Sequence, residues 1–257
     1  MKTLFVGQNS IHVESVDSTN SYASEMLRQI ALLEGSIIYT FVQLKGRGQR
    51  GNSWESEPNK NVALSLILYP KFLSVDQQFL LTKMTSLAVA DLMAEMLVGV
   101  IEPSEIRVKW PNDIYVGAQK IAGVLIENTL RETTIQTSVI GIGLNINQLK
   151  FAEKKATSLA MLSGREFELR DVFKRFCELI EARYLQLKSN NLVNIDNAYL
   201  ERLYRFNARA TYQSGETRFE GKIIGVSKIG LLQLELKSGE VKEFDLKEIA
   251  FADNVIT

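Results

Sequence analysis

The sequence predicts an α+β protein in two parts, a larger part that mixes strands and helices and a smaller β-rich part. Helical spacing of apolar residues marks four segments, at 23–33, 74–97, 169–187 and 195–205. Short apolar runs typical of strands lie between the first three of them. From residue 208 onward the segments are short and β-like, with Ser/Gly turn signals about ten residues apart. This change separates the two parts.

Three strands and one helix are expected in the first seventy residues. The strand over 11–16 runs into DSTN (17–20), a cluster of residue types that cap helices, so a helix begins there. Gly35 is placed to end that helix. A strand over 36–42 follows. The run 62–69 is almost continuously apolar, which predicts a buried strand.

The next elements are a helix and a group of strands. Ser74, with Gln77 three residues on, resembles a capping box and opens a helix that runs to about Leu97. The elements expected after it are a strand over 106–110, a hairpin over 114–127, a strand over 134–142 and a turn over 143–147.

Two helices close the larger part. The apolar residues of 169–187 fall on one side of an amphipathic helix, and Cys177 lies on or beside that side as a small core residue. A helix over about 195–205 follows. We place a boundary near Asn207, so that the domains span 1–207 and 208–257. Some 50 residues is a marginal size for independent folding, so the second domain is expected to pack on the first.

Composition excludes several classes of protein. The 257 residues include 30 basic and 30 acidic ones, so the chain lacks the charge expected for general nucleic-acid binding. A single cysteine excludes an internal disulfide, and with a single histidine, His12, it argues against a His/Cys metal site and a catalytic triad. Residues 1–7 lack the features of a secretory signal, and no run has the length of a membrane span. A cytoplasmic location is therefore expected.

The most unusual stretch is 43–54, QLKGRGQRGNSW. Its glycines allow the backbone to approach a ligand closely, and free backbone N–H groups in such a loop bind phosphate or carboxylate. Arg47 and Arg50 add cationic donors, and Trp54 offers a face on which a base can stack. The composition suits an anionic ligand that carries a base, such as a nucleotide. An exposed turn without a ligand has the same composition.

Three further motifs carry polar or glycine residues at strand positions. KWPND at 109–113 places a carboxylate at a strand end, which suits Mg²⁺ beside phosphate oxygens, although a Pro-Asn-Asp turn explains it equally. KIAG at 120–123 sets a lysine in an apolar strand, where a bound anion would stabilise its charge; a lysine with its amine in water is the alternative. GIGLNIN at 141–147 indicates either close approach of a ligand or a β-bulge.

The order and spacing of these motifs resemble those of biotin protein ligases. The resemblance covers nearly all of the larger part and rests on DSTN, Gln43, the GRGQRGNSW loop, KWPND, KIAG and GIGLNIN. It implies a mixed-sheet catalytic domain of the biotin/lipoate ligase type with helices on one face. It also implies that the β-rich tail is a small SH3-like barrel.

The resemblance assigns residues to two neighbouring sites. By this resemblance the biotin site comprises Ser18, Thr19, Asn20, Gln43, Gly46, Arg47, Lys120, Gly123 and Gly141. The nucleotide site comprises Gln49, Arg50, Trp54, Asn112, Asp113 and Asn145. Lys120 and Arg47 are the implied catalytic residues, and Asp113 would help to hold Mg²⁺ with the ATP phosphates.

The implied activity has two half-reactions. Biotin and ATP with Mg²⁺ first form biotinyl-5′-AMP, and a specific lysine of a biotin carboxyl carrier protein then takes the biotinyl group. DNA is not an expected partner, because the catalytic pattern begins at about residue 11 and leaves no room for a DNA-binding domain. A membrane is not expected either, since no run has the length of a membrane span. A monomer and a homodimer both occur in the family.

The loop departs from the family pattern at two positions. Gln49 and Asn52 stand where many relatives carry arginine. The first of those arginines is associated in the family with retention of the adenylate. We therefore expect either weaker retention or compensation by Arg50. We also expect residues 46–55 to order over the bound ligands.

Two other functions fit parts of the pattern. A lipoate–protein ligase or octanoyltransferase shares the fold, but the octanoyltransferases use a cysteine nucleophile, and Cys177 is far in sequence from every motif. A non-catalytic module that binds biotin or a nucleotide would not need Lys120. A nucleic-acid regulator is disfavoured by the zero net charge.

Overall fold

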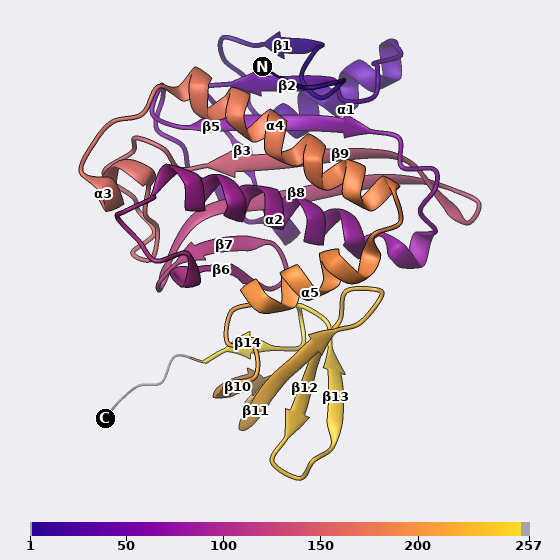
Figure 1. Cartoon of the computed structure of the whole chain (residues 1–257), viewed down its shortest axis with the longest axis vertical. Coiled ribbons are helices and arrows are strands. Elements are labelled where there is room, and N and C mark those ends of the chain that lie inside the picture. Colours follow the sequence, from indigo (N-terminus) through magenta and orange to yellow (C-terminus); the bar gives the residue numbers. More distant parts are fainter. Residues whose placement is uncertain (1, 253–257) are drawn as a thin grey trace.

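A seven-stranded mixed sheet forms the centre of the larger part (Figure 1). The computed structural model describes residues 2–252, apart from the side chain of Arg50. The strand order is β1-β2-β5-β9-β8-β7-β6; β1 and β2 are parallel, and the other neighbours are antiparallel. The strands are β1 (Ser10–His12), β2 (Ile37–Thr40), β5 (Val62–Leu68), β6 (Ile106–Lys109), β7 (Asp113–Val116), β8 (Gln119–Arg131) and β9 (Thr134–Leu144).

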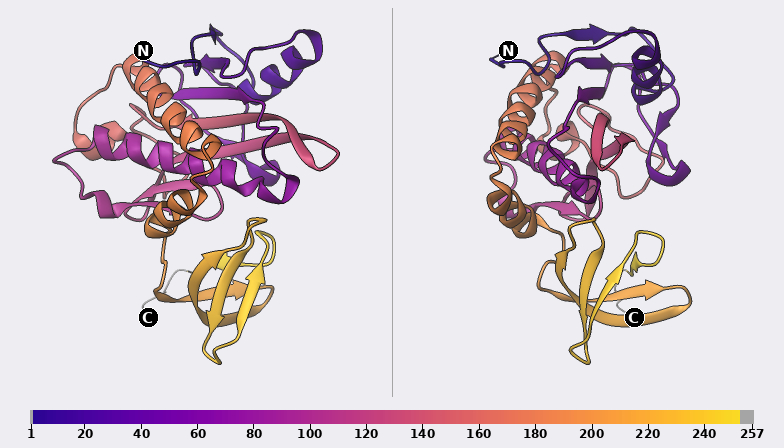
Figure 2. Two further views of the ribbon diagram at one scale, coloured as in Figure 1. Left: turned by 45° about the vertical axis from the view of Figure 1, so that its right-hand side comes forward. Right: turned by 90° about the vertical axis from the view of Figure 1, so that its right-hand side faces the viewer.

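Helices cover both faces of this sheet, which corrects the expectation that they lie on one face. The helices are α1 (Thr19–Gln29), α2 (Phe79–Met96), α3 (Leu159–Ser163), α4 (Leu169–Lys188) and α5 (Leu192–Arg202). Helices α2 and α4 lie on one face and α1 lies on the other (Figure 2). The physical reason is that β2 and β5 are buried along their whole length, so each face needs a cover. Ile37 faces the α2 core, whereas Ile38 packs with Ala23 of α1.

Most expected elements are confirmed, and several boundaries differ; for example, the first strand is Ser10–His12 instead of 11–16, and helix α5 is Leu192–Arg202 instead of 195–205. Ser74 and Gln77 form the expected capping box, which opens a 3-10 turn before α2. Helix α1 ends at Gln29 because Ile30 is extended, and Gly35 lies in a later turn at φ +83°. Strand β9 continues through the expected turn at Gly143 as far as Leu144.

Ion pairs join the helices of the α2 layer. Asp91 of α2 accepts from Arg183 of α4 at 2.6 Å and from Arg202 at the end of α5 at 3.0 Å. The buried Lys83 of α2 pairs with Asp196 of α5 at 2.8 Å. These contacts fix the helix layer behind the sheet, so the opposite face of the sheet can carry a site.

The C-terminal β unit (residues 209–252) is a five-stranded antiparallel sheet in the order β13-β12-β11-β10-β14. Its strands are β10 (Arg209–Ser214), β11 (Thr217–Val226), β12 (Leu232–Leu236), β13 (Val241–Phe244) and β14 (Ala250–Phe251). An antiparallel sheet of this size fits the small β domain expected from the sequence. The boundary near Asn207 stays a prediction.

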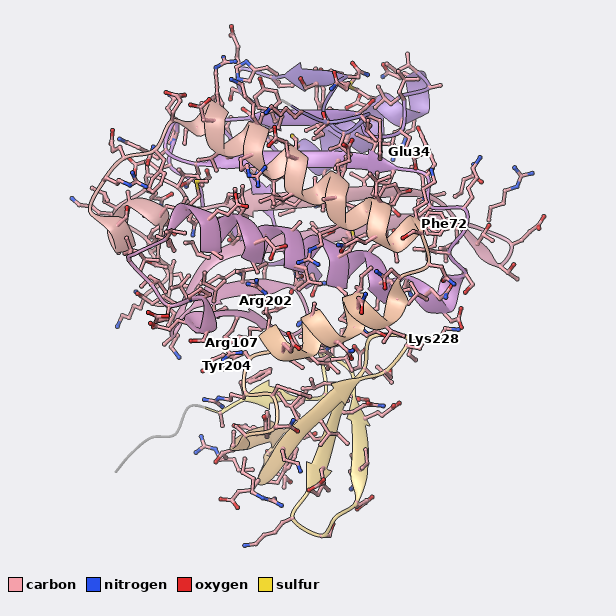
Figure 3. The ribbon with its side chains drawn as sticks, viewed as in Figure 1. Glu34, Phe72, Arg107, Arg202, Tyr204 and Lys228 are labelled. Atoms are coloured by element: carbon pink, nitrogen blue, oxygen red, sulfur yellow. The ribbon has the colours of Figure 1, made fainter. Side chains whose placement is uncertain are left out.

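The connection between the two parts is held on β6, and contacts of the β unit with the larger part include one turn (Figure 3). In the connection after α5, the Tyr204 N–H donates to the Val108 carbonyl of β6 at 2.8 Å, and within α5 the Glu201 carbonyl accepts from Arg107 of β6 at 2.6 Å. In the turn between β11 and β12, Lys228 pairs with Asp76. Among the described residues, no helix combines the length and hydropathy needed to span a bilayer.

Candidate active site

A cavity of about 440 Å³ opens on the α1 side of the sheet. Its walls come from five places in the chain: the start of α1, the segment 43–54 that includes the GRGQRGNSW loop, the KWPND turn between β6 and β7, the strands β8 and β9, and the segment 246–251 of the C-terminal β unit. These segments include every motif that the sequence singled out. We call the part formed by Ser18, Thr19, Asn20 and Gln43 the α1 end. The part formed by Gln49, Asn112, Leu246 and Phe251 is the β-unit end.

Hydrogen bonds fix the side chains of the α1 end. Gln43 Oε1 accepts from the Thr19 N–H at 3.0 Å. Ser65, fully buried in the middle of β5, donates to Asn20 Oδ1 at 2.6 Å and lies 2.9 Å from Thr19 Oγ1. Ser18 is the N-cap of α1, but its side chain makes no capping bond. The α1 end is therefore a rigid, neutral, polar surface.

A glycine of β9 allows α1 to approach the sheet. Gly141 pairs with Ser65 of β5 on one side and with Leu125 of β8 on the other. A Cβ atom at Gly141 would lie 2.8 Å from the Asn20 side-chain carbon Cγ. The group that approaches Gly141 is a side chain of the protein, and β9 pairs there without a bulge, so approach of a ligand stays a prediction.

Trp54 lies across two more glycines. The loop folds as a two-stranded ribbon, β3 (Gly46–Arg47) with β4 (Ser53–Trp54), joined by a short 3-10 turn over Gln49–Gly51. Cβ atoms at Gly123 and Gly143 would lie 2.9 and 2.6 Å from the indole atoms Cζ3 and Nε1. The glycines form one row, because Gly123 and Gly143 pair across β8 and β9. An aromatic face is thus held against the sheet floor of the cavity.

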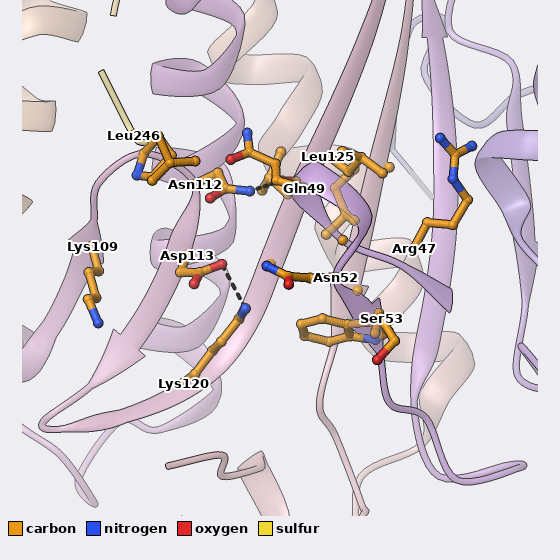
Figure 4. A pocket seen from close by; sticks show the side chains of 18 of the residues that line it. Arg47, Gln49, Asn52, Ser53, Lys109, Asn112, Asp113, Lys120, Leu125 and Leu246 are labelled. Atoms are coloured by element: carbon orange, nitrogen blue, oxygen red, sulfur yellow. Dashed lines mark hydrogen bonds and ion pairs between the residues drawn. The ribbon is translucent and has the colours of Figure 1, made fainter. Parts of the chain in front are cut away.

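Lys120 and Asp113 form an ion pair (Figure 4), and Lys120 also lies near the indole of Trp54. The Lys120 Nζ lies 2.9 Å from Asp113 Oδ1 and 5.3 Å from the centre of the Trp54 ring. Both side chains are mostly buried. Burial raises the pKa of Asp113 above its ordinary value of 3.8, and the positive charge of Lys120 opposes that shift. A cation and a carboxylate are therefore both available in the middle of the cavity.

A second carboxylate holds Arg47. Glu127 Oε1 accepts from the Arg47 guanidinium at 2.7 Å, and Glu127 Oε2 accepts from Asn20 Nδ2 at 2.9 Å. The same guanidinium donates to Ser21 of α1 at 3.1 Å. Glu127 does not itself line the cavity.

The C-terminal β unit completes the cavity. Leu246, Ile249, Ala250 and Phe251 line it. Trp110, which also lines it, donates from Nε1 to the Gly230 carbonyl at 2.8 Å. Lys109 lies with its Nζ 5.3 Å from the Phe251 ring centre. The cavity is therefore bounded by both parts of the chain.

The structure brings most of the predicted site residues together. The predicted residues that line the cavity are Ser18, Thr19, Asn20, Gln43, Arg47, Gln49, Trp54, Asn112, Asp113, Lys120, Gly123 and Gly141. Gly46 is buried outside the lining, because Trp54 and Gln43 leave no room for a side chain there. Asn145 also lies outside, since it donates to the Thr157 carbonyl at 3.0 Å and its N–H bonds to Ile121. The Arg50 side chain lies outside the described residues.

Sequence reasoning missed several residues of the site. Ser65 interrupts an apolar strand, and a buried hydroxyl needs a partner, so this position carried a usable signal. Glu127 follows Leu125 by two residues and therefore shares its face of β8. The residues of the β unit carry no such signal, because only the docking of the two parts brings them to the cavity.

The described residues include no group of three or more His, Cys, Asp or Glu side chains that could hold a metal ion by themselves. Asp113 is the single acidic residue among the described residues that line the cavity. A magnesium ion commonly takes one or two carboxylates and completes its shell with phosphate oxygens and water. The donor set therefore fits a metal that arrives with a phosphate ligand, and does not fit a resident metal.

Comparison with known proteins assigns the chain to a family. The model of the biotin/lipoate A/B protein ligase family matches residues 12–145, which is more than half of the chain. The chain therefore belongs to this family. The matched segment contains α1, the loop, KWPND, KIAG and the glycines of β9, which line the cavity together with the C-terminal β unit outside the match.

Individual relatives are biotin ligases. The bifunctional ligase/repressor BirA of Bacillus subtilis (strain 168) is 28% identical over 98% of this chain and 75% of its own length. The biotin–[acetyl-CoA-carboxylase] ligase of Paracoccus denitrificans is 28% identical over 87% of this chain and 92% of its own length. The structure of the biotin protein ligase from Aquifex aeolicus in complex with biotin and ATP is similar with a TM-score of 0.77, at 25% identity over 95% of this chain and 99% of that one.

Proposed function

We propose that the chain is a biotin protein ligase, which activates biotin with ATP and transfers it to a specific lysine of a biotin carboxyl carrier protein. The observation that carries the proposal is the joining, in one cavity of a biotin/lipoate ligase family member, of a rigid polar end, a paired lysine and a flat indole. The relatives named above support biotin as the acid and ATP as the nucleotide.

The first half-reaction joins two anions. A carboxylate oxygen of biotin attacks the α-phosphorus of ATP, the bond from that phosphorus to the bridging oxygen breaks, and pyrophosphate leaves. Like charges repel, so the enzyme must supply positive charge and fixed positions. We assign Lys120 to the carboxylate and α-phosphate oxygens, with Asp113 orienting its amine, and Arg47 to closure of the loop over the same anion.

The two ends of the cavity suit the two ligands. The ureido ring of biotin is neutral and carries both donors and an acceptor, which matches the amide and hydroxyl groups of Thr19, Asn20 and Gln43 at the α1 end. We assign the Trp54 face to the adenine ring and the β-unit end, with Asn112, to the rest of the nucleotide. Mg²⁺ would be held by Asp113 together with ATP phosphate oxygens, and would neutralise phosphate charge.

The second half-reaction releases AMP. The lysine Nε of the carrier attacks the acyl carbon, the new C–N bond forms, and the acyl–oxygen bond breaks with its electron pair going to AMP. The amine loses a proton to give the amide.

The mixed anhydride is open to hydrolysis, so the loop that carries Arg47 and Trp54 would protect it from water. We also propose that 1–207 and 208–257 act together as one catalytic unit.

Biotin-dependent exchange between ATP and labelled pyrophosphate tests the proposal, with lipoate and octanoate run in parallel. We expect exchange with biotin alone. A carrier domain is then added, and we expect one lysine of it to be biotinylated. Exchange with lipoate or octanoate instead would reject the assigned acid. Binding of biotin without any exchange would reject the enzyme in favour of a binding module.

A further inference from the structure

Glu127 connects three separate parts of the molecule through one carboxylate. It belongs to β8 and shares the cavity face of the sheet with Gly123 and Leu125. One of its oxygens accepts from Arg47 of the loop at 2.7 Å, and the other accepts from Asn20 of α1 at 2.9 Å. Asn20 continues the chain of hydrogen bonds to Ser65 of β5 at 2.6 Å.

Arg47 is held at the base of the loop. Its guanidinium also donates to Ser21 of α1 at 3.1 Å, so it bridges α1 and β8. In Figure 4 the guanidinium points away from the ion pair between Lys120 and Asp113. Arg47 itself lies in the short strand β3, which pairs with β4 and so sets the position of Trp54. Holding Arg47 therefore holds the ribbon that carries the indole.

We infer that Glu127 is a positioning residue that fastens the loop over the cavity through Arg47, and that it couples the α1 end to loop closure through Asn20. The inference rests on the proposed function for its effect on the adenylate, and on geometry alone for its effect on the loop. Glu127 does not line the cavity, so it acts through the groups that it holds.

The ion pair between Arg47 and Glu127 is partly exposed, which suits reversible binding of the loop. Side chains of Arg47 and Glu127 are 48% and 34% exposed. Ion pairs of this kind add little stability, because water competes for both charges. The loop can therefore open to admit ligands. Asn20 packs against Gly141 at the α1 end and donates to Glu127. A ligand that shifts the Asn20 side chain therefore also shifts the carboxylate that binds Arg47.

Hydrogen exchange of the ligand-free protein tests the fastening without any assumption about activity. Glu127→Gln keeps the size of the side chain and an oxygen for Asn20, but removes the charge that Arg47 requires. We expect backbone amides of residues 46–54 to exchange about threefold to fivefold faster in this variant. Unchanged exchange in the loop would overturn the inference, whatever the enzyme does.

A double-mutant cycle tests the route through Arg47. The readout is release of biotinyl-5′-AMP from the preformed complex, compared among native protein, Glu127→Gln, Arg47→Met and the double variant. We expect Glu127→Gln to speed release about threefold to fivefold in the native background and to have no further effect once Arg47 is absent. An equal effect in both backgrounds would mean that Glu127 acts on the site by packing, and would overturn the role in positioning Arg47.

A matched control distinguishes loss of the Glu127–Arg47 ion pair from loss of an ion pair elsewhere in the protein. Glu95→Gln removes the partner of Arg175 between α2 and α4, where the Nε–Oε2 distance is 2.6 Å, far from the cavity. We expect native loop exchange and native adenylate release in this variant. If no adenylate forms even in the native protein, the proposed function fails, and the exchange experiment still decides the role of Glu127 in holding the loop.

Discussion

The two ends of the cavity differ in how completely their polar groups are satisfied. At the α1 end, Thr19 and Asn20 are 4% and 3% exposed, and they are held by hydrogen bonds from or to Gln43, Ser65 and Glu127. Toward the β-unit end, Gln49 Oε1 and Trp54 Nε1 are buried and have no hydrogen-bond partner among the described residues. Buried polar groups are normally paired, so these two atoms are available to bond a ligand.

This difference suggests how the two ligands are recognised. The α1 end is formed by a helix packed on a sheet, and its geometry is set by the fold before any ligand binds. The β-unit end is formed by a loop, a turn and part of a second sheet, which come together only where the two parts of the chain meet. We therefore expect the ligand at the α1 end to be selected by shape and hydrogen bonds, and the ligand at the other end to complete its own site.

The largest effect is expected from the residue between the two ends. Replacing Lys120 with alanine removes the cation that we assign to both ligands, and it takes away the ion-pair partner of Asp113. We expect the rate of biotin-dependent pyrophosphate exchange to fall about 100-fold or more, because transition-state charge loses its stabilising group. Lys154→Ala, an exposed lysine outside the cavity, is the control. A rate within threefold of native would mean that Lys120 is not catalytic.

Substitutions at two glycines of β9 test the two ends of the cavity separately. Gly141→Ala drives a methyl group against Asn20, and Gly143→Ala drives one against Trp54. We expect the first to raise the KM for biotin about tenfold and the second to raise the KM for ATP by a similar factor, since overpacking costs about 1–3 kcal/mol. Steady-state kinetics with each substrate varied in turn measures both. If both variants raised the same KM, the division of the cavity into two ends would be wrong.

The pH profile addresses the charge between the ends. Burial raises the pKa of Asp113, so this carboxyl takes up a proton at a higher pH than an ordinary aspartate as the solution is acidified. Lys120 then loses its partner. As the solution is acidified, we expect the pyrophosphate exchange rate of the native protein to begin falling at a pH above 3.8. We expect the Asp113→Asn variant to be several-fold slower at neutral pH and to show no such fall. An identical acid limb in the variant would assign the titration to another group.

The smallest effect is expected at Gln49. Arginine at this position would add a cation beside the β-unit end, where Gln49 Oε1 has no partner among the described residues. We expect Gln49→Arg to slow the release of biotinyl-5′-AMP about threefold. Quenched-flow trapping of free adenylate measures it, with Asn52→Arg as a second variant in the same loop. No change in release would indicate that the adenylate is already retained by other groups.

The sequence predicted the elements better than their arrangement. Local signals were sufficient for the capping box at Ser74, the hairpin of β7 and β8, and the amphipathic helix α4. The cover of both sheet faces was not predicted, although the continuous apolar character of β5 indicated burial on both sides. Helix α1 was extended too far toward Gly35, because apolar spacing continues beyond the residue at which the backbone leaves the helix.

For the site too, the sequence predicted local features better than their arrangement in space. Motif order placed Thr19, Gln43 and Lys120 correctly on one cavity. Asn145 was expected there from the resemblance to the family, but β9 ends at Leu144 and the Asn145 N–H donates to the Ile121 carbonyl. The contribution of Phe251 depends on the docking of two sheets, and no periodicity within a single segment reports such docking.

Both tryptophans of the chain line the same cavity. Trp54 rests on glycines of the sheet, and Trp110 is joined to the β unit through Gly230. The intrinsic tryptophan fluorescence of this protein therefore comes from that cavity alone, with one emitter on the loop and one beside the C-terminal unit. Filling of the site is expected to change the emission without any label, and Trp54→Phe and Trp110→Phe variants would assign the change to each wall.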